Sequence, residues 1–343
     1  MPGSYLSFPF DEDVFNYRWG TEPDPVKTAM LQSGALVANA EIAAQIAGGG
    51  YKYSVPFYKT IGGTPVNYDG KTDITSTETS GAYQSGVVYG RANAWTARDF
   101  VADFNSGADP MGHIVASVAS FWAKYRQKQL INIANACFGV TDNGDFTNKW
   151  ADHTHNIAAT STTIGAANKV SETTFSDAAQ MACGDNDGIF SMAIMHSAVA
   201  KNLANLQLLE YRKYTDPSGI ERTLRIADVN GLLVVVDDGV PAALNDTSKA
   251  VEYTSYLFGA GALNYAPAPV DHPSEIEREP KKNGGQDTLI TRIRETILPN
   301  GFSYTEKTGD GVSPTDERLG DKSRYSLIHD PKAIAMAKIV SNG

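Results

Sequence analysis

Residues 194–241 decide the fold of this chain: they read IMHSAVAKNLANLQLLEYR at 194–212, DPSG at 216–219 and RTLRIADVNGLLVVVDDGVP at 222–241. The apolar run Ile189–Met195 leads into a short helix, for which Ser197 is the predicted N-cap, because serine accepts hydrogen bonds from free N–H groups at a helix start. The DPSG segment predicts a turn. The aliphatic run Leu232–Val236 predicts a buried strand, which the polar DDGVP segment ends.

The segment 110–138 carries the clearest helical pattern. Asp109 precedes Pro110, which is the preferred order of N-cap and first helical residue. Apolar residues then recur at three- and four-residue spacing, and Gly139 ends the pattern. The stripe consists of Ile114, Val118, Phe121, Trp122 and Tyr125 and continues through Leu130, Ile131 and Ala134 to Phe138. About 29 residues at ~1.5 Å each predict a helix of roughly 43 Å, long enough to act as a strut.

The N-terminal part divides into two kinds of sequence. Residues 1–24 are aromatic and polar and predict an extended arm, and Asp24 and Pro25 predict the start of a helix over Val26–Ala47 that ends at Gly48–Gly50. Residues 51–95 are rich in Thr, Ser, Tyr and Gly and predict a two- or three-stranded β excursion. An isolated hairpin is marginal in water, so this excursion needs support, from a neighbouring subunit or from its own domain.

The remaining segments predict a mixture of strands and short helices. Residues 141–172 are loop-like, 174–183 predict a helix that Gly184 ends, and 251–263 predict a strand. A polar turn at 281–286 precedes a predicted strand. Every second residue of this strand shares one face, namely Leu289, Thr291, Ile293, Glu295 and Ile297. A strand or short helix is expected at the end of the chain.

Composition and sequence pattern argue against three classes of protein: those that bind nucleic acid tightly through a basic surface, secreted proteins and membrane proteins. The 343 residues are 42% hydrophobic and carry 29 Lys and Arg against 39 Asp and Glu, a formal net charge of −10. Tight nonspecific phosphate binding needs clustered cations, and Lys281–Lys282 is the longest such cluster. Neither a signal peptide nor an 18-residue apolar stretch is present, so no membrane association is expected. Cys137 and Cys183 have no metal-binding spacing and are expected to be reduced and buried.

One set of histidines offers candidate chemistry. His153 and His155 form an H-x-H pair, which on a strand would place both rings on one face for a zinc ion, with His196 or Asp185 completing the ligands. The same residues define a rival hypothesis, a metal-dependent hydrolase. The loop-like surroundings instead favour histidines without a metal.

Other acidic clusters favour turns over catalysis. GDNDG at 184–188 begins like a calcium loop, but the twelfth position counted from Asp185 is His196 instead of glutamate. Asp237 and Asp238 follow a strand and precede Gly and Pro, which is typical of a turn cap. No P-loop, G-x-S-x-G or H-E-x-x-H motif occurs. We therefore expect no catalytic, cofactor-binding or metal-binding residues.

The order of these segments resembles the major capsid proteins of tailed phages of the Hong Kong 97 type. The resemblance lies in MHSAVAKNL at 195–203 followed by VVVDDGVP at 234–241, in ANAWTARDFVADFNSGADPMGHIVASVASFWAKYRQKQLI at 92–131, and in HDPKAIAMAKI at 329–339. It extends over nearly the whole chain.

The resemblance implies an α+β Hong Kong 97-like capsid fold. Its parts would be an N-terminal arm and helix at 1–50, an extended β loop at 51–95, a peripheral domain with its spine helix at 96–140, an axial domain at 141–284, and returning peripheral strands at 285–343. Some family members cross-link a lysine to an asparagine of a neighbour. Lys59 and Lys71 lie in the corresponding loop, but nothing in the sequence indicates the reaction.

The resemblance further implies a function without catalysis. The chain would assemble as pentamers and hexamers into an icosahedral virion capsid, in the host cytoplasm, around double-stranded DNA that it binds without sequence specificity. Its other partners would be a separate scaffolding protein, because no long region precedes the arm, together with a portal and decoration proteins. A nanocompartment shell of the encapsulin kind is the alternative with the same fold.

Overall fold

The structure is a computed structural model that describes residues 4–5, 8–9, 33–59, 63–74, 76, 78, 81–99, 110–141, 146, 148–206, 210–215, 221–229, 231–309 and 311–343. Most of the predicted arm, the start of the predicted helix at 26–32, Asp109 and the DPSG turn lie outside these residues. Two short strands of the arm, β1 (Ser4–Tyr5) and β2 (Phe8–Pro9), pair with each other. Among the described helices, none combines the length and apolarity that crossing a lipid bilayer requires.

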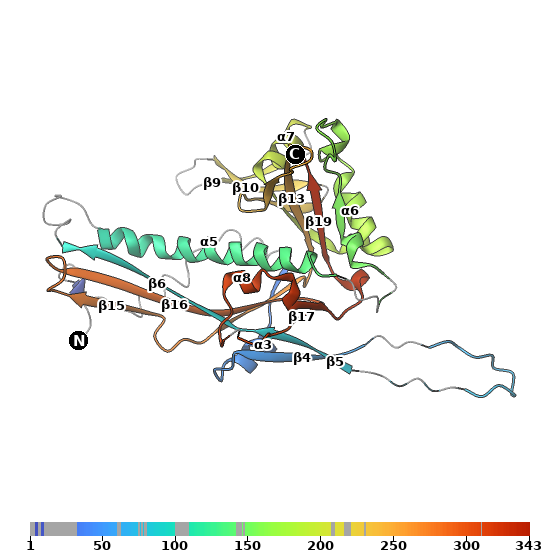
Figure 1. Cartoon of the computed structure of the whole chain (residues 1–343), viewed down its shortest axis with the longest axis horizontal. Helices are drawn as coiled ribbons and strands as arrows, with labels where there is room; N and C mark the ends of the chain where they lie inside the picture. Colours follow the sequence, from blue (N-terminus) through green and yellow to red (C-terminus); the bar gives the residue numbers. More distant parts are fainter. Residues whose placement is uncertain are drawn as a thin grey trace.

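An eight-stranded mixed sheet forms one part of the molecule (Figure 1). Its strand order is β7 (Thr154–Asn156), β19 (Met336–Ser341), β13 (Val251–Gly259), β8 (Phe190–Met195), β11 (Leu232–Val236), β10 (Glu221–Val229) and β9 (Glu210–Thr215), with β12 (Ala242–Leu244) beside β13. Helices α6 (Thr174–Cys183) and α7 (Ser197–Asn205) bury Phe175, Val199 and Leu203 against it. The strand, helix and strand predicted at 189–236 thus form β8, α7 and β11, and β8 pairs in parallel with β11.

A five-stranded sheet forms the second part and supports the long helix α5 (Pro110–Phe138), which lies along it in Figure 1. Strand β16 (Gln286–Pro299) is its centre. It pairs with β15 (Ser274–Glu279), with β14 (Leu263–Ala268) and, over ten positions from Arg98 to Tyr89, with β6 (Tyr89–Arg98). Strand β3 (Leu36–Ala38) runs parallel to β14.

A hairpin extends away from this sheet, formed by β4 (Lys52–Tyr58) and β5 (Gly81–Val87). Helix α3 (Ala40–Ile46) packs at its base, with Ile42 and Ile46 in one cluster with Tyr53. The other short elements are β17 (Phe302–Tyr304), β18 (Tyr325–Leu327), α8 (Asp316–Leu319) and 3₁₀ turns at Trp150–His153, Ala166–Asn168, Gly184–Ile189, Lys322–Arg324 and Pro331–Ala333.

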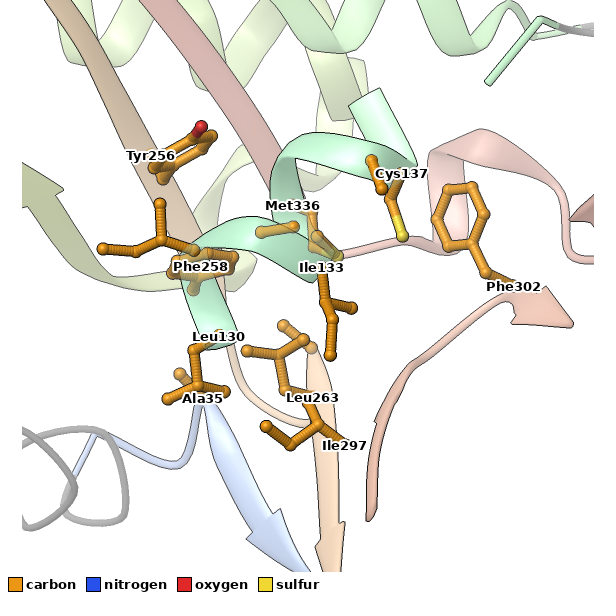
Figure 2. Packing of buried hydrophobic residues seen from close by; sticks show 14 of the residues in the cluster. Ala35, Leu130, Ile133, Cys137, Tyr256, Phe258, Leu263, Ile297, Phe302 and Met336 are labelled. Carbon is orange, nitrogen blue, oxygen red and sulfur yellow. The ribbon is translucent and has the colours of Figure 1, made fainter. Parts of the chain in front are cut away.

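The largest core cluster joins the two sheets through the C-terminal half of α5. Figure 2 shows Leu130, Ile133 and Cys137 of the helix among side chains from both sheets. Phe258 and Met336 come from the eight-stranded sheet, and Leu263 and Ile297 come from the five-stranded sheet. Removing apolar surface from water stabilises a fold by about 25 cal/mol per Å². The shared cluster therefore stabilises one arrangement of the helix and the two sheets.

Most predicted elements are confirmed. Helix α5 covers 110–138 as predicted, and α6 ends at Gly184, whose φ of 59° is readily available to glycine. The turn before β16 has positive φ at Asn283, Gly284 and Gly285. Both cysteines are free and buried. The described residues of 141–172 are loop-like except for the two 3₁₀ turns and β7.

Three local predictions were wrong. From residue 33 on, where the structure describes it, the predicted helix over Val26–Ala47 contains a strand at 36–38 and a helix over 40–46, because Ala35 and Leu36 pack in the core and β3 pairs with β14. The N-cap of α7 is His196 instead of Ser197, which is already the first helical residue; the His196 ring accepts from the N–H of Ala198 at 3.1 Å. Phe121 is 39% exposed and lies at the margin of the buried stripe.

Candidate assembly site

The N-terminal half of α5 is fixed to the five-stranded sheet by a small core and one specific hydrogen bond. Val118 and Trp122, each 2% exposed, pack with Ala97 of β6 and Leu289 of β16. The indole Nε1 of Trp122 donates to the Thr291 hydroxyl at 3.1 Å. Because Thr291 is fully buried, this bond satisfies two polar groups that burial would otherwise penalise.

A buried ion pair continues the contact along the helix. Glu295 of β16 is 1% exposed and accepts from Arg126 Nε of α5 at 2.9 Å. The hydroxyls of Tyr89 and Tyr265 donate to the same carboxylate at 3.0 and 3.2 Å. Burial, followed by the neighbouring Glu295 carboxylate, raises the pKa of Tyr89 well above its ordinary value, so the phenol remains a donor. A buried charge is tolerated when it is paired and hydrogen-bonded in this way.

Helix α5 also contacts elements outside this sheet. The Asp316 carboxylate of α8 accepts from Arg91 Nη2 at 2.6 Å and from the Tyr125 hydroxyl at 2.8 Å. Partial burial raises the pKa of Asp316, but these donors outweigh that effect and the net pKa lies below the ordinary value. On the opposite side, Gln127 donates to Asp237 at the end of β11, and Asn135 accepts from the Tyr256 hydroxyl at 3.3 Å. The helix is therefore a strut between both sheets.

The base of the β4–β5 hairpin is anchored to the body by buried polar contacts. Gln84 Nε2 donates to the carbonyl oxygens of Pro299 and Phe302 at 2.7 and 2.8 Å. The Tyr53 hydroxyl and the Thr296 hydroxyl lie 2.7 Å apart, and Lys52 forms an ion pair with Glu306. A Cβ at Gly86 would lie 2.2 Å from the Tyr53 ring, so only glycine fits there.

Beyond this base the chain leaves the body. Every described residue of 63–78 is exposed, including Tyr68 at 94% and Ile74 at 78%. Among its described residues, a turn at Asp69 holds the local backbone: the N–H groups of Lys71 and Thr72 donate to Asp69 Oδ1, each at 2.8 Å. Figure 1 shows the segment projecting far past β4 and β5. Exposed aromatic and aliphatic side chains on such a projection are typical of a surface that contacts another molecule.

The three candidate zinc ligands have separate structural roles. His153 lies in a 3₁₀ turn, is 1% exposed, stacks on Trp150 and places Nδ1 2.6 Å from the Met336 carbonyl oxygen. Burial lowers the pKa of its imidazole. His155 lies on β7, paired with Ile339, and His196 caps α7. The residues that the structure describes contain no group of three or more His, Cys, Asp or Glu side chains placed to hold a metal ion.

The acidic clusters form caps and ion pairs. Asp237 accepts from the N–H of Gly239 at 2.9 Å, and Asp238 accepts from the N–H of Ser197 at 3.1 Å, so the predicted turn cap is confirmed. Asp185 pairs with Lys332, whose hydrogen bond and charge lower the Asp185 pKa. Lys59 and Lys71 both lie in the projecting part of the hairpin, as the sequence predicted.

Comparison with known proteins gives the family. No protein-family model matches the chain. The major capsid protein of Bacillus phage SPP1 is 33% identical over 314 residues, which cover 91% of this chain and 90% of the relative. Among solved structures, the capsid of Ralstonia phage GP4 superposes with a TM-score of 0.56 at 9% identity, over 90% of this chain and 87% of the other. The capsid protein of cyanophage Pam1 gives 0.50 at 11% identity, over 86% of each chain.

These findings decide between the hypotheses. The structural neighbours share the α+β Hong Kong 97-type fold, and the relative covers nearly the whole chain. They support neither an encapsulin-like compartment nor a hydrolase built on His153, His155 and His196. The function is structural and not enzymatic, and the place of such a protein is the capsid of the virion. The chain belongs to the major capsid proteins of tailed phages.

Proposed function

We propose that this chain assembles as pentamers and hexamers into an icosahedral shell around double-stranded DNA, and that residues 59–80 hold neighbouring subunits together. The observation that carries the proposal is the contrast at the hairpin. Its base is anchored through Gln84 and Tyr53, while Tyr68 and Ile74 beyond it are 94% and 78% exposed. Such side chains lower the free energy only when a second subunit covers them.

The charge of the chain suits this function. A net charge of −10 disfavours tight, nonspecific binding of phosphate groups, which suits a shell that encloses DNA without sequence-specific contacts. We further propose the partners that such a shell requires: a separate scaffolding protein, a portal and decoration proteins, with assembly in the host cytoplasm.

The division into domains is part of the proposal. The sequence divides the body into an axial part at 141–284 and a peripheral part at 96–140 and 285–343. Strand pairing supports two changes to this division. Strands β14 and β15 would belong to the peripheral part, since both pair with β16. Strand β19 would belong to the axial part, since it pairs with β13.

Electron microscopy of the purified protein, with and without its scaffold, tests the assembly. Two variants test the role of the loop. In one, residues 63–78 are replaced by two glycines; in the other, a Gly/Ser linker of unchanged length replaces them. Both keep Gln84 and the β4–β5 pairing, so the free subunits should melt at the wild-type temperature. Neither should form stable shells. Shells of ordinary stability from the shortened protein would show that the loop does not hold subunits together.

A further inference from the structure

One strand edge of the five-stranded sheet is open among the described residues. Strand β6 pairs with β16 on one side, and no described strand pairs with its other side. The direction of its peptide groups follows from Gly90, whose N–H donates to the Ser313 hydroxyl at 3.0 Å and whose carbonyl accepts from it at 3.3 Å. Because backbone directions alternate along a strand, the N–H and C=O groups of Ala92, Ala94 and Thr96 also point away from β16.

Strand β6 carries Arg91 and Arg98 near its ends, but the middle of this edge lacks the proline and the charged side chains that usually protect a strand edge from pairing. Residues 92–97 read ANAWTA and contain no proline and no charge. The bonds to Ser313 are confined to Gly90. Among the outward-pointing backbone groups of residues 92–97, the structure shows one bond, and it is local: the N–H of Ala94 donates to the Asn93 side chain at 2.9 Å. An edge of this length with free donors and acceptors is suited to accept an additional strand.

An exposed aromatic side chain lies beside the same edge. The Phe121 ring of α5 contacts Trp95 of β6 edge to face, with centroids 5.2 Å apart, and remains 39% exposed. Odd-numbered residues of β6 face α5, and even-numbered ones face solvent. A strand added to β6 would therefore meet apolar surface on its helix-facing side and solvent on its other side, which requires alternating apolar and polar residues.

The arm of the chain contains this pattern. Phe15, Tyr17 and Trp19 alternate with Asn16 and Arg18, and these residues lie outside those the structure describes. We propose that residues 14–19 of a second copy add a strand to the open edge of β6, with the three aromatic side chains on the Phe121 side. The proposal rests on the assembly proposed above and names a contact separate from the 59–80 loop.

Cysteine trapping in assembled particles tests the pairing. Arg18→Cys is combined in turn with Ala92→Cys, Ala94→Cys and Thr96→Cys, whose side chains share the solvent-facing side of β6. A disulfide requires Cα atoms within about 7 Å, which adjacent strands satisfy. The native cysteines are buried and do not interfere. At least one pair should give covalent oligomers on oxidation of particles and none in free subunits.

The matched control places the second cysteine one strand farther away. Ile290 of β16 is opposite Ala94, on the same face of the sheet. Arg18→Cys with Ile290→Cys should give no cross-link, because two strand spacings of about 4.8 Å exceed the reach of a disulfide. Absence of cross-links at all three β6 positions would overturn the proposal while particles still form. Cross-links only within one chain would also overturn it, since the donor would then not be a second copy.

A proline variant tests the edge without cysteines. Ala92→Pro removes an N–H that points away from β16, so the β6–β16 hydrogen bonds remain. The free subunit should melt as the wild type does, and the concentration needed for assembly should rise about fivefold from the loss of one intersubunit hydrogen bond. Assembly at the wild-type concentration would contradict an added strand at this edge.

Discussion

Helix α5 lies along the body of the molecule, and the segment 63–78 projects from it. The two differ in the contacts that hold them in position. The helix buries Trp122 and Leu130 against two sheets and adds the ion pair of Arg126 with Glu295. The described residues of the segment are all exposed, and the base of the hairpin is anchored through Gln84. Mutations in the helix should therefore destabilise the free subunit, while changes in the segment should affect only the assembled shell.

The largest effect on the subunit is expected for Trp122→Ala. Truncating a buried large aromatic side chain costs about 3–5 kcal/mol of unfolding free energy, and the hydroxyl of Thr291 would also lose its donor. Denaturant unfolding of the free subunit measures the loss. Phe121→Ala, one residue earlier and exposed, is the matched control and should cost less than about 1 kcal/mol. Equal losses would show that the two aromatic side chains are equally packed.

A somewhat smaller effect is expected at the ion pair. Arg126→Met leaves the Glu295 carboxylate buried with only two tyrosine donors, which should cost about 3 kcal/mol. The double variant Arg126→Met with Glu295→Gln removes the uncompensated charge and should recover part of the loss. A double-mutant cycle on unfolding free energies measures the coupling. A double variant less stable than the sum of the two single changes would contradict the pairing.

The sequence predicted which face of an element is buried better than it predicted which residues that face contacts. The alternation from Leu289 to Ile297 correctly identified one face of β16, yet it gave no reason for buried Thr291 and Glu295. Their partners, Trp122 and Arg126, lie about 170 residues earlier in the chain. Such pairs depend on the register of α5 over the sheet, which no local pattern contains.

The same limit explains the errors at the N-terminus and at the hairpin. The Ala-rich pattern predicted a helix through residues 36–38, where pairing with β14 gives a strand. Gln84 was missed because a glutamine in a Ser- and Gly-rich strand is typical of a solvent-exposed position, although its amide donates to the carbonyl oxygens of Pro299, the last residue of β16, and Phe302, the first residue of β17. The boundary of the short helix α7 also differs by one residue from the prediction, since His196 is its N-cap in place of Ser197.

At the base of the hairpin we expect an intermediate effect. Gln84→Leu keeps the approximate side-chain volume but leaves the carbonyl oxygens of Pro299 and Phe302 without a donor, at a cost of about 1–3 kcal/mol. Hydrogen exchange of the β4–β5 amides should accelerate more than that of the α5 amides. The neighbouring, exposed Tyr83→Leu is the control and should change neither quantity. Unchanged exchange in Gln84→Leu would show that the hairpin is held by other contacts.

The smallest effect on the subunit, and the greatest difference between subunit and shell, is expected for cleavage within 63–78. Gly70 has a φ of 72° and lies in a stretch whose described residues are all exposed, so a protease can reach its peptide bonds. Cleavage there should leave the melting temperature of the free subunit unchanged, because no described side chain of the segment packs on the body. In particles the same bonds should resist cleavage, since the proposed contact with a neighbour covers them. Gly81 pairs with Tyr58 in the hairpin and serves as the internal control: it should be cut more slowly than Gly70 in free subunits. Equal cleavage rates at Gly70 in particles and in free subunits would place the segment outside any intersubunit contact.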